Sequence, residues 1–147
     1  MDLKSIIFDY LSKTQMMQLG TSHNNQPWVT TVYFAYDANL NLYWLSNPSK
    51  RHSEEIKKNS KVAGSIVVMH NYGDKVRGLQ FEGEARKLSG SEAELAVNIY
   101  KSRYWIVEGR ATNALGPQDT CYQLHPKKFV LFDEVNFPQE PSQVLEI

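Results

Sequence analysis

The segment from Val76 to Leu88 most constrains the fold, because it predicts one unusually long strand with an apolar face and a polar face. The two faces are Leu79, Phe81 and Ala85 against Gln80, Glu82, Glu84 and Arg86. Strands of this length with one polar face curl, and Gly78 and Gly83 provide places to bend or to admit a ligand. The segment therefore favours a curved antiparallel sheet.

Shorter patterns along the chain complete the expected elements. Strands are predicted from Met16, from Trp28 to Tyr36, from Leu40 to Ser46, from Val62 to Met69, and at Cys121 to Leu124 and Phe129 to Phe132 on either side of Pro126. We expect the first three to form a meander. Helices are predicted at Leu3 to Leu11 with Asp2 as N-cap, at Ser49 to Asn59, and from the capping box Ser91 to Glu94 to about Lys101. The stretch from Tyr104 to Pro117 reads as a short helix followed by a Gly/Pro loop.

About six antiparallel strands with two or three helices predict a mainly β domain, closed or half-closed into a barrel that removes exposed edges. The length of 147 residues fits one domain, which we place at residues 1–135. Residues 136–147 contain two prolines and are predicted to form a C-terminal arm outside the core.

Composition excludes several classes of function. Sixteen basic and sixteen acidic residues give no net charge, which argues against nucleic-acid binding. The longest apolar run, Ile66 to Met69, is too short to cross a membrane, and no N-terminal signal is visible. The single cysteine, Cys121, fits a reducing cytoplasmic setting, and the four histidines lack metal-ligand spacing, so no metal site is expected.

Residues 46–52, with the sequence SNPSKRH, carry the clearest functional signal. A strand runs into Ser46, Asn47 and Pro48 interrupt it, and the predicted helix would carry Lys50, Arg51 and His52 in its first turn. Cations are disfavoured there, because the first turn already presents unpaired N–H groups and the positive end of the helix dipole. A bound phosphate would remove the conflict. The alternative is a solvated basic turn.

Three further residues are candidates for ligand contacts. Gln80 lies on the polar face of the long strand, where its amide can both donate to and accept from the edge of a ring with carbonyl and imide groups. Thr30 and Thr31 lie in the middle of a predicted strand. Each of the three has a plain structural alternative, an exposed strand residue for Gln80 and ordinary β-branched strand residues for the threonines.

Taken together, the segments PWVTTVYFAYD from Pro27, NLYWLSNPSKRHSEEIKKNSKVA from Asn41 and VRGLQFEGEARKLSG from Val76 resemble the FMN-binding split barrels related to pyridoxamine 5'-phosphate oxidase. The resemblance covers Met16 to Leu88 in the family order, with a weaker match at Tyr122 to Asp133. The chain looks closest to a subgroup of short, poorly characterised bacterial members. The resemblance implies a six-stranded antiparallel split β-barrel.

The resemblance also implies a homodimer with FMN in the cleft between the two chains. Carried over by position, Thr30, Thr31 and Val32 would line the flavin, and Gln80 would meet the edge of its ring. The 5'-phosphate would be held by four residues of the basic segment: Ser46, Lys50, Arg51 and His52.

The chain departs from pyridoxamine phosphate oxidases near its C-terminus, where they place an arginine for the substrate's phosphate. No arginine follows Arg110, so oxidation of vitamin B6 phosphates is doubtful. Arg77 or Arg103 is a speculative substitute. The substrate side is expected to come from Tyr104 to Pro117 and the tail, and the substrate itself is not indicated.

Three functions remain open. The first is an FMN-dependent oxidoreductase of a small molecule, whose catalytic residues are unknown because the cofactor supplies the chemistry. The second is a non-enzymatic module that binds flavin, deazaflavin or haem, with His23, His70 and His125 as possible axial ligands of haem. The third is a dimeric interaction domain that has lost its ligand.

Overall fold

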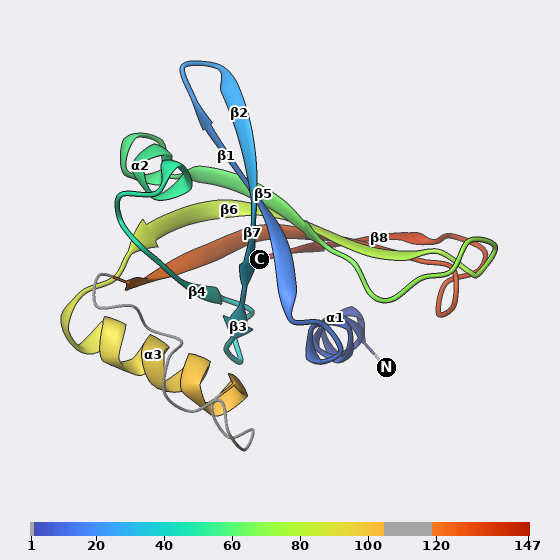
Figure 1. The fold of residues 1–147 in the computed structure, drawn as a ribbon. Coiled ribbons are helices and arrows are strands. Elements are labelled where there is room, and N and C mark those ends of the chain that lie inside the picture. Colours follow the sequence, from blue (N-terminus) through green and yellow to red (C-terminus); the bar gives the residue numbers. More distant parts are fainter. Residues whose placement is uncertain (1, 105–118) are drawn as a thin grey trace.

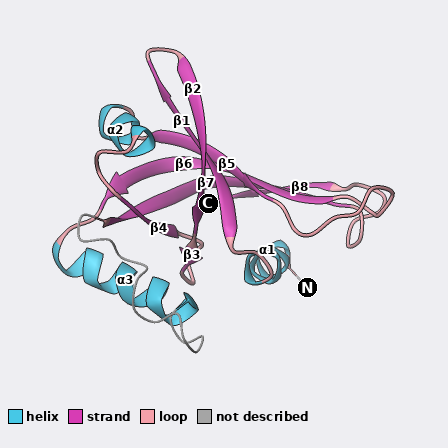
Figure 2. Ribbon diagram, viewed as in Figure 1, coloured by secondary structure: helices cyan, strands magenta, loops and turns pink. Residues whose placement is uncertain are grey.

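The computed structural model describes residues 2–104 and 119–147, and it shows one curled antiparallel sheet with helices packed around it (Figure 1). In chain order the elements are α1 (Leu3–Ser12), β1 (Met16–His23), β2 (Gln26–Tyr33), β3 (Ala35–Tyr36), β4 (Leu42–Ser46), α2 (Arg51–Lys58), β5 (Lys61–Ile66), β6 (Arg77–Lys87), α3 (Gly90–Tyr104), β7 (Thr120–Asp133) and β8 (Ser142–Glu146). Strands dominate the architecture (Figure 2), which confirms the predicted mainly β split barrel.

The strand count differs from the prediction. Within the described residues the sheet has eight strands in the order β2-β1-β5-β6-β7-β4-β3, with β8 paired to β7, instead of six. One extra strand arises because Phe34 and Ala35 are both fully buried. Two consecutive inward-facing residues break the alternation of a strand, so the predicted strand from Trp28 to Tyr36 divides into β2 and β3. The second extra strand is β8, which is formed by part of the predicted C-terminal arm at residues 136–147.

The predicted meander is correct for its first two strands and correct in part for the third. β1 and β2 form a hairpin, and β4 pairs with β3, the end of the predicted second strand, but it also pairs with β7 and does not pair with β2. The break at Phe34 allows the chain to leave the hairpin and cross to the other end of the sheet. Asn24 and Asn25 form the hairpin turn, with φ values of 51° and 61°. Two-residue hairpin turns of type I′ require positive φ at both central residues. This turn places Thr21 opposite Trp28.

The long strand β6 forms the centre of the sheet between β5 and β7. Its predicted apolar face is buried, and its register with β7 shifts between Glu82 and Gly83. A Cβ added at Gly83 would lie 2.2 Å from the carbonyl oxygen of His125, so only glycine fits at this bulge. Opposite the bulge, Pro126 lies within a continuous β7, which joins the two short strands predicted there.

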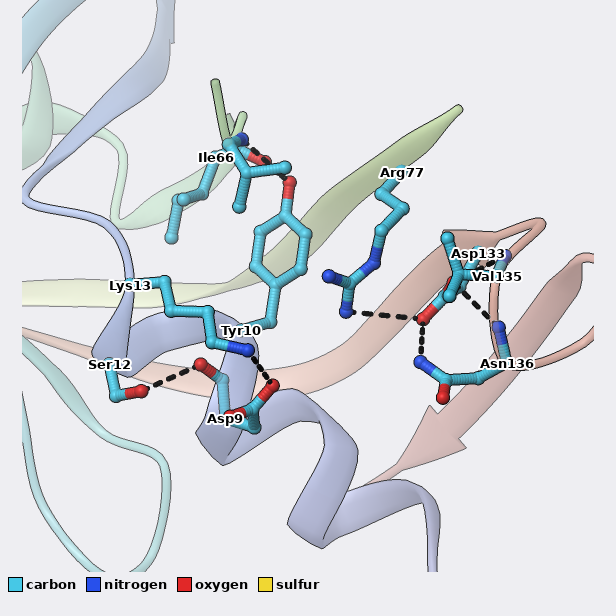
Figure 3. Close-up of polar contacts among 10 residues, drawn as sticks. Asp9, Tyr10, Ser12, Lys13, Ile66, Arg77, Asp133, Val135 and Asn136 are labelled. Carbon is cyan, nitrogen blue, oxygen red and sulfur yellow. Dashed lines mark hydrogen bonds and ion pairs between the residues drawn. The ribbon is translucent and has the colours of Figure 1, made fainter. Parts of the chain in front are cut away.

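Helix α1 is attached to the sheet by a buried polar network (Figure 3). Its predicted N-cap is confirmed, because the Asp2 side chain accepts a hydrogen bond from the Ser5 backbone at 2.9 Å. The Tyr10 hydroxyl donates to the Ile66 carbonyl at 2.8 Å. The guanidinium of Arg77 lies 5.5 Å from the centre of the Tyr10 ring and pairs with the fully buried Asp133 at 3.3 Å.

The last described turn of α3 also packs against the barrel. Arg103 donates to the backbone carbonyls of Leu11 and Thr14, and its guanidinium lies 4.9 Å from the ring centres of both Phe34 and Tyr36. The helix extends past its predicted end to Tyr104, and the loop predicted up to Pro117 lies outside the described residues. None of the described helices combines the length and hydropathy needed to span a bilayer.

Candidate cofactor-binding site at the start of α2

Helix α2 begins after a tight turn that delays it relative to the prediction. The side-chain oxygen of Asn47 accepts hydrogen bonds from the backbone N–H and the hydroxyl of Ser49, both at 2.9 Å. The backbone carbonyl of Asn47 accepts a third, from the backbone N–H of Lys50, at 3.1 Å. Lys50 is therefore the N-cap with extended backbone, and not a first-turn residue as predicted, whereas Arg51 and His52 are in the first turn. No side chain among the described residues caps this helix start.

Ser46 and His52 are brought together as a buried pair. Ser46 Oγ, at the end of β4, lies 2.7 Å from Nε2 of His52, and the two residues are 8% exposed. Burial, followed by the nearby charge of Lys50, lowers the pKa of His52 below its ordinary value. The imidazole is therefore neutral near pH 7 and serves as a hydrogen-bonding group, so the cationic charge at this turn comes from Lys50 and Arg51.

Arg51 is held by one residue from α2 and one from β2, and the first of these is anchored to β1. Its Nε donates to Glu55 Oε2 at 2.8 Å, one turn along α2, and its guanidinium carbon lies 4.1 Å from the centre of the Trp28 ring on β2. The other carboxylate oxygen of Glu55 accepts from Thr21 Oγ1 on β1 at 2.8 Å. The hydrogen bond from Arg51 is the main reason that the pKa of Glu55 lies below its ordinary value.

The buried hydroxyl of Ser53, which follows His52 in the first turn of α2, supports an anion site at the helix start. Ser53 is 2% exposed, and its Oγ has no hydrogen-bond partner among the described residues. Buried polar atoms in folded proteins are nearly always paired, so an orphan in the first turn of an uncapped helix indicates a missing acceptor. A phosphate satisfies both the hydroxyl and the N–H groups of the helix start.

The remaining predicted residues are distributed over both faces of the sheet. Thr30 and Val32 face inward, because they pair with the buried Leu19 and Met17. Thr31 faces outward and donates to the side chain of Gln18 at 2.8 Å. Residues that are paired across neighbouring strands form a row on this outer face, which consists of Gln18, Ser65, Gln80, Val130 and Val144. No hydrogen bond or ion pair between described residues joins Gln80 to the basic helix start.

Sequence reasoning did not identify Thr21, Trp28 and Glu55 as site residues. The spacing of Arg51 and Glu55 on one helix face was a usable signal, because oppositely charged residues four apart are neighbours. The Asn24-Asn25 turn was a second signal, since its two residues set the register that places Thr21 opposite Trp28. Neither signal shows that the hairpin lies against α2, which depends on the tertiary fold (Figure 1).

Comparison with known proteins identifies the family of this chain. The family model for pyridoxamine 5'-phosphate oxidase matches residues 4–131, so the chain belongs to that family. A relative described as a UPF0306 protein, from Pasteurella multocida, is 30% identical over 99 residues, which are 67% of this chain and 66% of that relative's length. This confirms the resemblance to short bacterial members.

Two solved structures show the same fold. A candidate pyridoxamine 5'-phosphate oxidase from Listeria innocua matches with a TM-score of 0.71 at 19% identity, covering 88% of this chain and 98% of that one. A haem-binding protein from Mycobacterium smegmatis matches with a TM-score of 0.73 at 12% identity, covering 92% and 54%. At these identities the matches establish the fold alone.

Proposed function

We propose that this protein binds FMN as a homodimer and acts as a flavin-dependent oxidoreductase on a small molecule. The observation that carries the proposal is the uncapped start of α2, where Arg51, His52 and Ser53 are consecutive residues of the first turn, His52 contacts Ser46, and the Ser53 hydroxyl has no partner among the described residues. This arrangement suits a phosphate monoester, and membership of the pyridoxamine 5'-phosphate oxidase family supports FMN as the molecule that carries it.

The outer face of the sheet supports the homodimer. Met16, Val29, Phe132 and Val144 lie on the same face as the Gln18-to-Val144 row, and each is between 39% and 59% exposed. Large exposed apolar side chains that lie among polar residues such as Gln80 and Glu82 mark interaction surfaces. A second copy would cover this face, and would bring its own Gln80 toward the first copy's cofactor, which explains why no contact within one chain joins Gln80 to α2.

The residues of the chain then divide the work of binding. Arg51 and Lys50 provide charge for the phosphate, and Ser46, His52 and Ser53 provide uncharged hydrogen-bonding groups. Thr30, Thr31 and Val32 line the ring with strand backbone and side chains, and Gln80 of the second copy hydrogen-bonds to its edge. When bound, FMN supplies hydride-transfer chemistry, and the protein supplies binding, orientation and electrostatics.

Pyridoxamine phosphate oxidation is not part of this proposal. Both arginines considered as substitutes for the missing substrate arginine have other partners, since Arg77 pairs with buried Asp133 and Arg103 binds backbone carbonyls. The substrate therefore differs from a vitamin B6 phosphate, or its phosphate is held by residues outside the described part of the chain.

A non-enzymatic binding module is the second candidate, because a structural neighbour binds haem. Of the three histidines considered as axial ligands, His125 is held by Asn41 at 2.9 Å on the exposed side of β7, His70 lies exposed between β5 and β6, and His23 ends β1. These positions are on separate elements. Haem absorbance of the purified protein, in place of flavin absorbance, would favour this candidate.

The proposal is tested by titrating the apoprotein with FMN and following the quenching of flavin fluorescence. Arg51→Gln is expected to weaken binding about 10- to 100-fold, the effect of losing one charge-assisted hydrogen-bonding group. Lys58→Gln, in the last turn of the same helix, removes the same charge and is expected to change the affinity less than about twofold. Equal effects of the two variants, or no binding by the wild type, would contradict the proposal.

A further inference from the structure

Glu55 is an acidic residue directly beside a site that we propose to bind an anion. Its carboxylate is 8% exposed and has two partners, Arg51 Nε and Thr21 Oγ1, both at 2.8 Å. Thr21 is itself 3% exposed, so this carboxylate is anchored to β1 from within the protein. A buried carboxylate next to an anion site weakens the local positive potential, and its presence therefore requires a separate reason.

The geometry of Arg51 provides that reason. Its Nε is bonded to Glu55, and its guanidinium is stacked against the Trp28 ring at 4.1 Å. No described residue accepts a hydrogen bond from Nη1 or Nη2, and 46% of the side chain is exposed. One edge of the guanidinium is thus held by the protein, while the other edge, which carries the paired donors for bidentate recognition, has no partner among the described residues.

We propose that Glu55 is a positioning residue, which with Thr21 and Trp28 fixes the orientation of Arg51 so that its Nη edge meets the terminal phosphate oxygens of the ligand. This inference rests on the proposed function, because it specifies how that same site recognises phosphate. Long arginine side chains lose rotamer freedom when they bind, and a guanidinium that is already fixed loses less of it. Glu55 thereby strengthens anion binding despite its own negative charge.

The sign of one substitution separates positioning from simple electrostatics. If the site attracts phosphate only by its summed charge, Glu55→Gln removes a neighbouring negative charge and tightens FMN binding. If Glu55 acts by positioning Arg51, the same substitution replaces the charge-assisted hydrogen bond from Arg51 Nε with a weaker bond to a neutral amide and weakens FMN binding by up to about tenfold. Riboflavin, which has the same ring and no phosphate, should bind the variant and the wild type equally within about twofold, because Arg51 makes no contact with the ring in this account.

The experiment measures dissociation constants of FMN and riboflavin for the wild type, Glu55→Gln, Arg51→Gln and the double variant. Glu54→Gln is the matched control, since it removes the same charge from the neighbouring, exposed position of the same helix. We expect Glu54→Gln to leave both constants within about twofold of the wild type, because an exposed charge is strongly screened. In the Arg51→Gln background, Glu55→Gln should cause no further loss of FMN affinity, since nothing remains to be positioned.

Each outcome decides the inference. A selective loss of FMN affinity in Glu55→Gln that disappears in the double variant supports it. Unchanged or tighter FMN binding, or an equal loss for FMN and riboflavin, overturns it while the proposed function stands. A wild type that binds neither flavin overturns both. If Glu55→Gln fails to fold, Thr21→Val, which keeps the ion pair, provides the same comparison, with a selective loss of FMN affinity expected and equal losses for both flavins contradicting the inference.

Discussion

The hydroxyl oxygen of Ser46 lies 2.7 Å from Nε2 of His52, and both side chains are buried where β4 ends and α2 begins. This contact connects the end of β4 to the first turn of α2 across the turn at residues 47–50. It also places a titratable group in a site that we propose to bind phosphate. The protonation of His52 therefore affects the folded protein and its ligand together.

The stability of the protein should depend on pH through His52. Because its pKa is lowered by burial, the unfolded chain binds a proton at about pH 6.5 while the folded protein does not. The free energy of unfolding should fall as the pH decreases from 6.5 toward the lower folded pKa, by up to about 1.4 kcal/mol per pH unit. Urea unfolding of the wild type and His52→Gln from pH 8 to pH 5 should show this decline only in the wild type. A constant difference between the two proteins would contradict the prediction.

The β6 bulge should tolerate no side chain at Gly83. An alanine there would place its Cβ 2.2 Å from the His125 carbonyl oxygen, so the backbone of β6 or β7 must shift. We expect Gly83→Ala to lower the free energy of unfolding by about 1–3 kcal/mol. Gly78→Ala on the same strand is the control, because nothing lies within 4 Å of its Cβ, and a loss below about 0.5 kcal/mol is expected. Equal losses in chemical denaturation would contradict this explanation of the bulge.

The ion pair between Arg77 and Asp133 should be important for stability (Figure 3). Asp133 is fully buried, so Asp133→Asn leaves Arg77 without a counterion and should cost about 3–5 kcal/mol. Although burial alone would raise the pKa of Asp133, hydrogen bonds from Asn136 and the charge of Arg77 hold it below its ordinary value. The stabilisation is thus present above about pH 3.9 and is lost as the pH falls through the folded pKa.

The control for this pair is the ion pair between Asp9 and Lys13, which are one helix turn apart. Asp9 pairs with Lys13 at 2.7 Å, but both side chains are about half exposed, so Asp9→Asn should cost less than about 1 kcal/mol. Thermal and urea unfolding at pH 7 measure both variants. The wild type and Asp133→Asn should converge in stability in acid. A difference that stays the same from pH 7 into the acid range would contradict the assignment.

The homodimer should depend on the outer sheet face. Val144→Glu places a charge in the row of Gln80 and Phe132→Glu places one in the neighbouring row, and burying an unpaired charge in an interface costs several kcal/mol. Sedimentation velocity should show a dimer for the wild type and a monomer for these variants. Leu95→Glu, at a more exposed apolar position on α3, should remain a dimer. Dimeric Phe132→Glu and Val144→Glu proteins would place the interface elsewhere.

Much of the fold was predictable because its strands and helices carry strong local patterns. The alternation along β6 predicted which side chains are buried, and Asp2 predicted the start of α1. Pairing between distant strands was not predictable, because the two inward-facing residues Phe34 and Ala35 send the chain across the sheet, and no local pattern shows where it pairs next. The pairing of β8 was not predictable either. Its partner β7 is 14 residues long, and no local pattern shows which part of β7 it pairs with.

The candidate site was predicted in part for the same physical reason. Ser46, Arg51 and His52 lie close together in the sequence, and the structure brings them together. Lys50 is the N-cap of α2 because the Asn47 side chain forms hydrogen bonds with Ser49, which make the helix begin later than predicted. Trp28 and Thr21 come from a hairpin that is distant along the chain, and only the packing of that hairpin against α2 places them beside Arg51.

The most direct test of the proposed function is the identity of the molecule released from the purified protein. The protein is purified without added cofactor and denatured, and the released small molecule is characterised by its absorbance spectrum and its mass. The account predicts a yellow protein that releases FMN at close to one molecule per chain. A colourless protein that does not take up added FMN, or a protein that releases haem or a deazaflavin, would contradict it.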